Sequence, residues 1–419
     1  MALVANYSAV VGEGVVRNLA QLAAKLRGAK VLHVNSTRQG GGVAEILEKL
    51  VPLQCELGME VRWEIIEGSA DFYRCTKSFH NALQGQPVDV GTALLQEYEE
   101  ANRRTAEKLG KLARDADFVF VHDPQPAALL RAFPERKGKW IWRCHIDLSR
   151  PHRPVWRYLR GIVAGYDASV FSLADFAQML PHPSYIVPPA IDPLSEKNME
   201  LADEEIRAAY RRFGIDAERK VMLQVSRFDR FKDPVGVIRA YRLAKAFIPG
   251  LQLVLAGGGA TDDPEGAAVL AEVRDVAGDD RDVHILLLPP DAHRTINALQ
   301  RGADFVLQKS LREGFGLTVA EAMWKGKAVI GGDTGGIRLQ VIDHHTGFLV
   351  RSPEGAALRI RYLLNHPARF AEMGRKAREF VRENFLLTRQ VREYLALMVA
   401  LQHGTGERIE VIEDSRWMQ

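Results

Sequence analysis

The chain has 419 residues, of which 47% are apolar and 26% are charged, and its formal net charge at pH 7 is +3. This composition excludes a disordered protein, and the length exceeds what a single core normally organises, so we expect two globular domains. The charges are interspersed along the chain. That pattern argues against nucleic-acid binding and against a membrane-surface protein, and leaves small anions as the charged ligands to expect.

The cysteines predict neither a disulfide framework nor a zinc site. Cys55, Cys75 and Cys144 form no CxxC pair and lack the spacing of metal ligands. The N-terminal stretch MALVANYSAVVGEG has no basic start followed by an apolar core, and no apolar run reaches the length of about eighteen residues that a membrane span needs. We therefore expect a protein of the reducing cytoplasm without a membrane anchor.

Short apolar runs alternate with longer amphipathic stretches from end to end, which predicts parallel sheets covered by helices on both faces. Helical patterns between the strands include 43–57, 92–114, 234–247 and 264–277, and beyond about residue 352 only helices are expected. The predicted strands are 30–35, 60–66, 117–122, 140–144, 168–171, 184–187, 221–225, 251–256, 283–288, 304–307 and 328–330.

The alternation breaks once, at the proline-rich stretch IVPPAIDPLSEKN, where we place an interdomain hinge near residues 188–194. The prediction is an N-terminal domain of residues 1–190 and a C-terminal domain of residues 191–385. Ligands of open parallel sheets bind outside the carboxyl ends of the strands, so two such domains predict a cleft between them. The strand-end residues are therefore the candidates for function.

In the first half, HVNSTRQGGGVAE places Gly40, Gly41 and Gly42 between the first strand and a helix. Glycines there allow backbone N–H groups to approach a phosphate, although a plain flexible turn explains them equally well. The later strand ends carry His122 with Asp123 and His145 with Asp147. Single histidines at such positions are more often structural than catalytic, but two His–Asp pairs on adjacent strands favour a site. A serine hydrolase is disfavoured because the chain has no GxSxG motif.

In the second half, SRFDRFKDP follows a strand and precedes a helix that begins at Asp233 and Pro234. Its Arg227, Arg230 and Lys232 form a basic loop that can neutralise a diphosphate, and a solvated loop is the alternative. The segment EGFGLTVAE places Glu313 and Glu321 eight positions apart. Paired acids suggest a glycosidase, but a glycosidase has no use for the basic loop and the glycine-rich strand ends. Transfer of a sugar from a nucleotide uses all three features.

The segment EGFGLTVAEAMWKGKAVIGGDTGG resembles the E-x7-E signature of the retaining glycosyltransferases of family 4, and SRFDRFKD resembles their R-x4-K phosphate loop. This resemblance covers nearly the whole chain. It implies the GT-B fold, with two Rossmann-like domains, the active site between them, and a last helix, residues 386–419, that packs back on the first domain. The motifs HVNSTRQGGGVAE, VHDPQP and WRCHID are similar to those of trehalose synthases of the glycosyltransferring type, and also to those of retaining trehalose phosphorylases.

The resemblance implies a role for each matched residue. Arg227 and Lys232 clamp the diphosphate, Glu313 holds the donor sugar and Glu321 holds the ribose hydroxyls. His145 contacts the donor glucose near the reacting centre, and Gly40, Gly41 and Gly42 close over the diphosphate or the acceptor. The further substrate-binding candidates are Asp123, Asp147, Phe315, Gly316 and Leu317. No metal site is expected, because Asp262 and Asp263 are adjacent and lack the DxD spacing.

The implied reaction moves glucose from NDP-glucose to the anomeric hydroxyl of free glucose, reversibly and with retention, to give trehalose and NDP. Phosphorolysis of trehalose, another family 4 glucosyl transfer and a catalytically silent nucleotide-sugar-binding protein are the alternatives. No tightly bound cofactor is expected, and Mg²⁺ that accompanies the nucleotide is left open. The expected partners are small molecules, without nucleic acid or membrane, and the resemblance implies a homodimer. The preferred base of the donor is not predicted.

Overall fold

The computed structural model describes residues 2–38, 41–258 and 264–403, which form two compact units. The first unit runs to Pro189 and resumes at Leu387, and the second runs from Ala190 to Leu386. Among the described residues, each unit contains one parallel sheet of six strands. The α/β class with two helix-covered parallel sheets, predicted from the strand–helix alternation, is confirmed.

The sheet of the first unit has the order β2-β1-β3-β4-β5-β6. Its central strands are almost continuously apolar because helices cover both of their faces, whereas the edge strand β2 is partly exposed along its whole length. The strands are β1 (Lys30–Asn35), β2 (Glu60–Ile65), β3 (Phe118–His122), β4 (Lys139–Arg143), β5 (Ala168–Phe171) and β6 (Ser184–Ile186).

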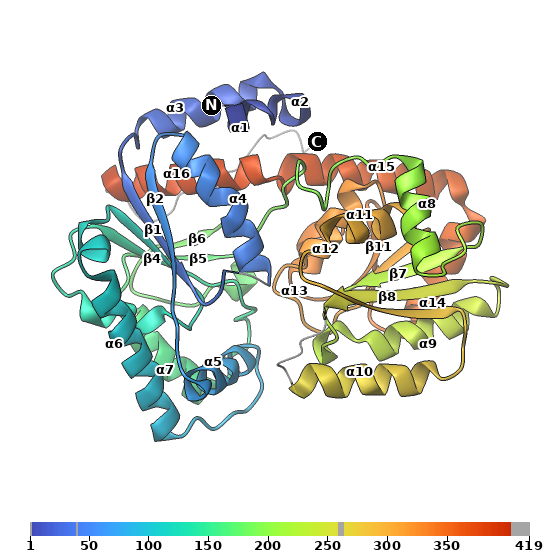
Figure 1. The fold of residues 1–419 in the computed structure, drawn as a ribbon, viewed down its shortest axis with the longest axis horizontal. Helices are drawn as coiled ribbons and strands as arrows, with labels where there is room; N and C mark the ends of the chain where they lie inside the picture. The colour runs from blue at the N-terminus through green and yellow to red at the C-terminus, as the bar shows by residue number, and fades with distance from the viewer. Residues whose placement is uncertain (1, 39–40, 259–263, 404–419) are drawn as a thin grey trace. The chain divides into compact units, whose positions relative to one another are not determined.

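Two groups of helices cover the two faces of this sheet (Figure 1). Neighbouring strand residues point to opposite faces, so Val31 and Phe120 pack against α3, α4 and α16, while Leu32 and Val121 pack against α5, α6 and α7. The helices of this unit are α1 (Ala2–Ala5), α2 (Ser8–Val11), α3 (Glu13–Ala24), α4 (Gly42–Glu56), α5 (Ala70–Leu83), α6 (Thr92–Asp115), α7 (Arg153–Val163) and α16 (Leu387–His403), with short 3-10 turns η1 (Ala127–Ala132) and η2 (Ala174–Phe176).

The sheet of the second unit has the order β12-β11-β10-β7-β8-β9. The eleven predicted strands of the two sheets are confirmed to within two residues at either end. The edge strand β12 was not predicted. The strands of this sheet are β7 (Val221–Val225), β8 (Gln252–Gly258), β9 (Val283–Leu288), β10 (Phe305–Gln308), β11 (Val329–Gly332) and β12 (Gly347–Val350).

Helices also cover both faces of the second sheet (Figure 1). Met222 and Leu253 pack against α9, α10 and α14, whereas α11 contacts β7 and α12 contacts β10 and β11. The helices are α8 (Asp203–Arg212), α9 (Pro234–Lys245), α10 (Pro264–Ala277), α11 (His293–Gly302), α12 (Leu317–Trp324), α13 (Gly335–Gln340), α14 (Pro353–Asn365) and α15 (Pro367–Asn384), with a 3-10 turn η3 (Arg230–Lys232). The all-helical segment expected beyond residue 352 is confirmed up to His403.

Each sheet has one point where the strand order reverses. In the first sheet the chain passes from β1 outward to β2 and returns to β3 on the other side of β1. In the second it passes from β7 outward to β8 and β9 and returns to β10 on the other side of β7. The helices that follow the two central strands leave toward opposite sides at such a point, which opens a crevice at the carboxyl ends. The candidate residues therefore have one expected place in each unit.

In the part of the chain that is described, every helix is too short or too polar to cross a membrane.

Candidate active site

A buried ion pair lies at the reversal point of the second sheet. Lys232 follows β7 and Glu313 follows β10, and Lys232 Nζ donates to Glu313 Oε2 at 2.6 Å. Ser310 Oγ donates to the same oxygen at 3.2 Å. The side chains of Lys232 and Glu313 are only 17% and 9% exposed, so each charge depends on the other for its stabilisation. Two residues predicted separately, one from the basic loop and one from the acidic motif, are thus in direct contact.

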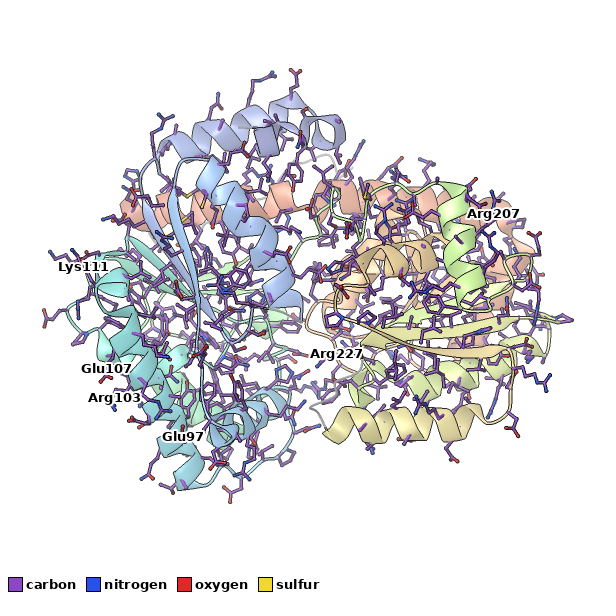
Figure 2. All side chains as sticks on the ribbon, viewed as in Figure 1. Glu97, Arg103, Glu107, Lys111, Arg207 and Arg227 are labelled. Atoms are coloured by element: carbon purple, nitrogen blue, oxygen red, sulfur yellow. The ribbon has the colours of Figure 1, made fainter. Side chains whose placement is uncertain are left out.

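Arg227 lies in the loop after β7, and its side chain is 55% exposed (Figure 2). Its Nη2 donates to Asp229 Oδ2 at 3.3 Å. Asp229 Oδ1 also accepts from Phe231 N at 2.7 Å, which caps the 3-10 turn that carries Lys232. The loop therefore offers two cations that differ in exposure and in geometry, the accessible guanidinium of Arg227 and the buried ammonium group of Lys232.

Asp233 ends this loop in the left-handed conformation, with φ of 50°, and caps α9 by accepting from Gly236 N at 3.1 Å. A Cβ at position 236 would lie 2.2 Å from Asp233 Oδ2, so only glycine fits beneath the cap. Lys309, directly after β10, donates to the other oxygen of the same carboxylate and is 4% exposed. Lys309 was not predicted as a site residue, although a lysine at the end of a buried strand is a signal that the sequence contains. The contact between Lys309 and Asp233 holds the basic loop against the end of β10.

Glu321 lies in α12 and is 1% exposed. No described residue donates a hydrogen bond to its carboxylate oxygens, although Lys197 Nζ is 3.4 Å from Oε1. One turn later, Lys325 Nζ donates to Asn198 Oδ1 at 3.0 Å and to Glu321 O at 3.1 Å. Burial lowers the pKa of Lys325 to about 7, against the opposing effect of the Glu321 charge. Glu321 thus keeps two acceptor oxygens, which suit a pair of neighbouring hydroxyl groups.

The backbone between the two acids is held rigidly. Gly316 has φ of 86° at the start of α12, and Gln340 Nε2 donates to Phe315 O at 2.6 Å. A Cβ at Gly336 would lie 2.3 Å from Phe315 Cα, so the glycine-rich segment after β11 allows this close approach. The first N–H groups of α12, among them that of Leu317, have no partner within the helix and carry partial positive charge.

In the first unit, three histidines form a hydrogen-bonded row across the reversal point. His145 Nε2 lies 3.0 Å from His122 Nδ1, His122 Nε2 lies 3.1 Å from His33 Nδ1, and His33 Nε2 lies 3.0 Å from Gln54 Oε1. Burial lowers the pKa of His33 to about 4 and those of His122 and His145 well below their usual value. All three imidazoles are therefore neutral at pH 7. Neither His33 nor Gln54 was predicted as a site residue.

The two candidate aspartates of this unit support the backbone. Asp123 has φ of 64°, and its Oδ1 accepts from His145 N at 2.7 Å. Burial raises the pKa of Asp123 to about 7. Asp147 Oδ1 accepts from Ser149 N at 3.0 Å and from Ser149 Oγ at 2.6 Å. The histidines thus bond to one another through their rings, and Asp123 fixes the backbone at His145.

The glycine-rich loop of the first unit is described from Gly41 onward, and Gly40 lies outside the described residues. Gly41 has φ of 86°, a value that favours glycine, and Gly42 begins α4. Asp262 and Asp263 also lie outside the described residues. Across residues 2–38, 41–258 and 264–403, no group of three histidine, cysteine or acidic side chains is arranged to hold a metal ion.

Comparisons with known proteins agree with this geometry. Residues 33–178 match the family of trehalose synthase N-terminal domains, and residues 205–380 match the glycosyl transferases of group 1. The chain is 47% identical to a trehalose synthase of Pyrococcus horikoshii, over 94% of this chain and 96% of that one. It is 45% identical to a trehalose synthase of Rubrobacter xylanophilus, over 95% and 96% of the two chains.

Among solved structures, a trehalose 6-phosphate synthase of Burkholderia multivorans superposes with a TM-score of 0.73 at 16% identity, covering 91% of this chain and 100% of that one. At that identity the likeness concerns the fold alone, and the fold is GT-B. Candidate residues cluster at the reversal point of each of the two parallel sheets. Together with the family match and the similar proteins, this arrangement identifies the chain as a glycosyltransferase. It belongs to the trehalose synthase family, of the glycosyltransferring type. The family resemblance read from the motifs is confirmed.

Proposed function

We propose that this glycosyltransferase forms trehalose from a nucleoside diphosphate glucose and free glucose, with retention at the donor carbon, and that the second unit binds the donor. The observation that carries the donor assignment is the Lys232–Glu313 pair at the reversal point, with the exposed guanidinium of Arg227 in the same loop as Lys232. A cation and a carboxylate in contact match the two adjoining parts of such a donor, its diphosphate and its sugar.

In this proposal the side chains of the site change partners when the donor binds. Lys232 Nζ turns from Glu313 to a phosphate oxygen, Arg227 forks the diphosphate, and Glu313 accepts from hydroxyl groups of the glucose. Glu321 accepts from the ribose hydroxyls. The free N–H groups at the start of α12, behind Phe315 and Gly316, add partial positive charge for the diphosphate.

The chemical step needs no protein nucleophile. The bond between the glucose anomeric carbon and the phosphate oxygen breaks, and its electron pair leaves with the nucleoside diphosphate. The acceptor oxygen bonds to the same face of that carbon, and its proton passes to a phosphate oxygen. Lys232 and Arg227 stabilise the charge that grows on the leaving group, which is where a preformed positive field lowers a barrier most.

The first unit supplies the remaining contacts of the proposal. His145 contacts the transferred glucose, Asp123 holds its backbone, and Asp147 shapes the turn that follows. Gly41 and Gly42, in the described part of the glycine-rich loop, contact the diphosphate or the acceptor. No tightly bound cofactor is required, and Mg²⁺ enters only as a companion of the nucleotide. A reducing cytoplasm and a homodimer belong to the same proposal, and light scattering of the purified chain checks the homodimer.

Product analysis with a panel of donors tests this function. We expect trehalose from glucose with at least one of ADP-, UDP- and GDP-glucose, and the reverse reaction when trehalose is incubated with the matching NDP. Lys232→Ala, prepared in parallel, controls for activity carried over from the expression host. Glucose release from trehalose with inorganic phosphate alone would establish the phosphorylase instead. Binding of NDP-glucose without turnover under any condition would establish a silent binding protein.

A further inference from the structure

The three histidines of the first unit lie on one diagonal across three neighbouring strands. His33 of β1 is in register with Phe120 of β3, two residues before His122, and His122 is in register with Arg143 of β4, two residues before His145. A shift of two residues keeps a side chain on the same face of the sheet. That face is covered by α4, which supplies Gln54. The row is thus a product of strand register.

Packing fixes the orientation of the rings. The ring of His33 stacks on that of Phe120, with centroids 5.0 Å apart, and the ring of His122 lies edge to edge with that of His145, with centroids 5.3 Å apart and the ring planes within 19° of each other. His33 and Gln54 are completely buried, and His122 is 2% exposed. Rings held in this way cannot turn to exchange their nitrogens, so the choice left to each imidazole is which nitrogen carries its proton.

That choice is collective. A neutral imidazole has one N–H donor and one acceptor nitrogen, and each bond of the row needs one of each. The row therefore has two consistent states: every histidine protonated at Nε2, or every histidine protonated at Nδ1. Gln54 presents Oε1, which can only accept, to His33 Nε2. This selects the state in which Nε2 of His33, of His122 and of His145 carries the proton.

The row also has a closed end. Gln54 is a neutral amide in the core, so a proton that entered at His145 would find no group to take it at the other end. Proton transport through the row is thereby excluded. At the open end, His145 Nδ1 keeps its lone pair, and no hydrogen bond to it from a described residue is present. The row therefore fixes Nδ1 of His145 as a hydrogen-bond acceptor.

We propose that Gln54 is a positioning residue which, through His33 and His122, holds His145 as the Nε2–H tautomer, so that His145 Nδ1 accepts a hydrogen bond from a hydroxyl group of the sugar substrate. The inference deepens the proposed function, on which its substrate part rests. It assigns the recognised ligand group by chemistry: an O–H donor is accepted there, and a group that offers only acceptors is refused.

The direct test is the tautomer itself. The full chain is labelled with ¹⁵N-histidine, and long-range ¹H–¹⁵N spectra at pH 7 distinguish a protonated from an unprotonated ring nitrogen. Signals are assigned by replacing His33, His122 and His145 one at a time with Gln. We expect the wild-type chain to show Nε2–H tautomers at all three positions. An Nδ1–H tautomer or an imidazolium at His145 would overturn the proposal.

The role of Gln54 is tested by Gln54→Met, which keeps the volume and removes the amide. We expect His145 to become a mixture of tautomers and kcat/KM for the sugar nucleotide to fall about tenfold, the worth of roughly one hydrogen bond to a neutral group. Gln390→Met is the matched control, because Gln390 is equally buried in the same unit and its amide has no described partner. It should leave the tautomer and kcat/KM unchanged.

An unchanged His145 tautomer in Gln54→Met would refute the role of Gln54, even if activity fell through loss of stability. The test separates this inference from the proposed function. If no donor in the panel gives trehalose but the spectra show the Nε2–H row and its loss in Gln54→Met, the proposed function fails and the tautomer assignment stands.

Discussion

The polar groups buried at the strand ends are stabilised differently in the two sheets, by hydrogen bonds between neutral rings in the first and by ion pairs in the second. At the reversal point of the first sheet, three neutral imidazoles bond to one another, and the one buried charge beside them in the described residues of β4 is that of Arg143. At the reversal point of the second, full charges are buried and compensated in pairs, Lys232 with Glu313 and Lys309 with Asp233. Burying a paired charge costs far more desolvation than burying a hydrogen-bonded neutral group. The paired charges of the second unit support our proposal that this unit binds the diphosphate of the donor.

The largest effect on activity is expected when one of the buried ion pairs of the second unit is removed. Lys232→Ala should lower kcat about 10²- to 10³-fold, the loss seen when one donor to a growing negative charge is removed. Steady-state kinetics with NDP-glucose and glucose measures it. Because Glu313 loses its partner in a buried position, the variant should also unfold more easily.

Lys220→Ala is the matched control for that variant. Lys220 pairs with Asp304 at 2.7 Å, and these residues directly precede β7 and β10, the same two strands that Lys232 and Glu313 follow. The pair lies at the amino ends of the strands, away from the carboxyl ends where ligands bind. Turnover of Lys220→Ala should stay within about twofold of the wild type. An equal loss in both variants would contradict the assignment of Lys232 to the leaving group.

The contribution of the neutral histidines of the first unit to the free energy of unfolding should depend on pH. His33 has a pKa of about 4 in the folded chain and about 6.5 when unfolded, so below pH 6.5 the unfolded chain binds the proton first. The contribution of His33 to the free energy of unfolding should therefore be lost as pH falls from 6.5 toward 4, by about 2 kcal/mol at pH 5.

Urea unfolding of the wild type and of His33→Phe at pH 7 and pH 5 measures this effect. The wild type should lose more free energy of unfolding between the two pH values than His33→Phe does, because phenylalanine has no proton to bind. Contributions of groups that His33 does not contact, Asp123 included, are shared and cancel in the difference. The exposed His403, replaced by Gln, is the control and should behave as the wild type. Identical pH dependence in wild type and His33→Phe would show that His33 is charged in the folded chain.

The smallest effect is expected where charges are neither buried nor near a reversal point. Arg103 and Glu107 pair on α6 with side chains 57% and 63% exposed, and Figure 2 labels both on the outer surface of that helix. Solvent and salt screen such pairs. Glu107→Ala should leave kcat unchanged and the melting temperature within about 2 °C of the wild type. A shift as large as that of Lys232→Ala would mean that burial does not explain the difference between the ion pairs.

Local patterns explain which parts of the fold could be predicted. The strands β3 and β7 read clearly as FVFVH and VMLQV because burial on both faces requires continuous apolar residues. The edge strand β12, GFLV, is short and starts with glycine, so its pattern does not differ from that of a loop. Helix α9 was readable from Asp233 and Pro234, a cap and a first-turn proline.

The site was predictable as residues but not as contacts. Arg227, Lys232, Glu313 and Glu321 carry motif spacings, and their roles remain predictions. The pairing of Lys232 with Glu313 joins positions 81 residues apart and depends on the placement of β10 beside β7. Gln54 belongs to no motif, and His33, the first residue of HVNSTRQGGGVAE, was not predicted to have a role in the site. A histidine inside a buried strand, in KVLHVN, was the one available signal, because a buried polar ring needs a partner.

The return of the chain to its first unit has a consequence for synthesis. The second unit is continuous from Ala190 to Leu386, whereas the first lacks α16 until residues 387–403 have been made. Tyr394 and Leu395 of that helix belong to the same core cluster as Val31 and Phe120. During translation, therefore, the second unit can complete its core first, while the N-terminal sheet still lacks α16 on the face that α3 and α4 cover in part. The unit encoded second can thus finish folding before the unit encoded first.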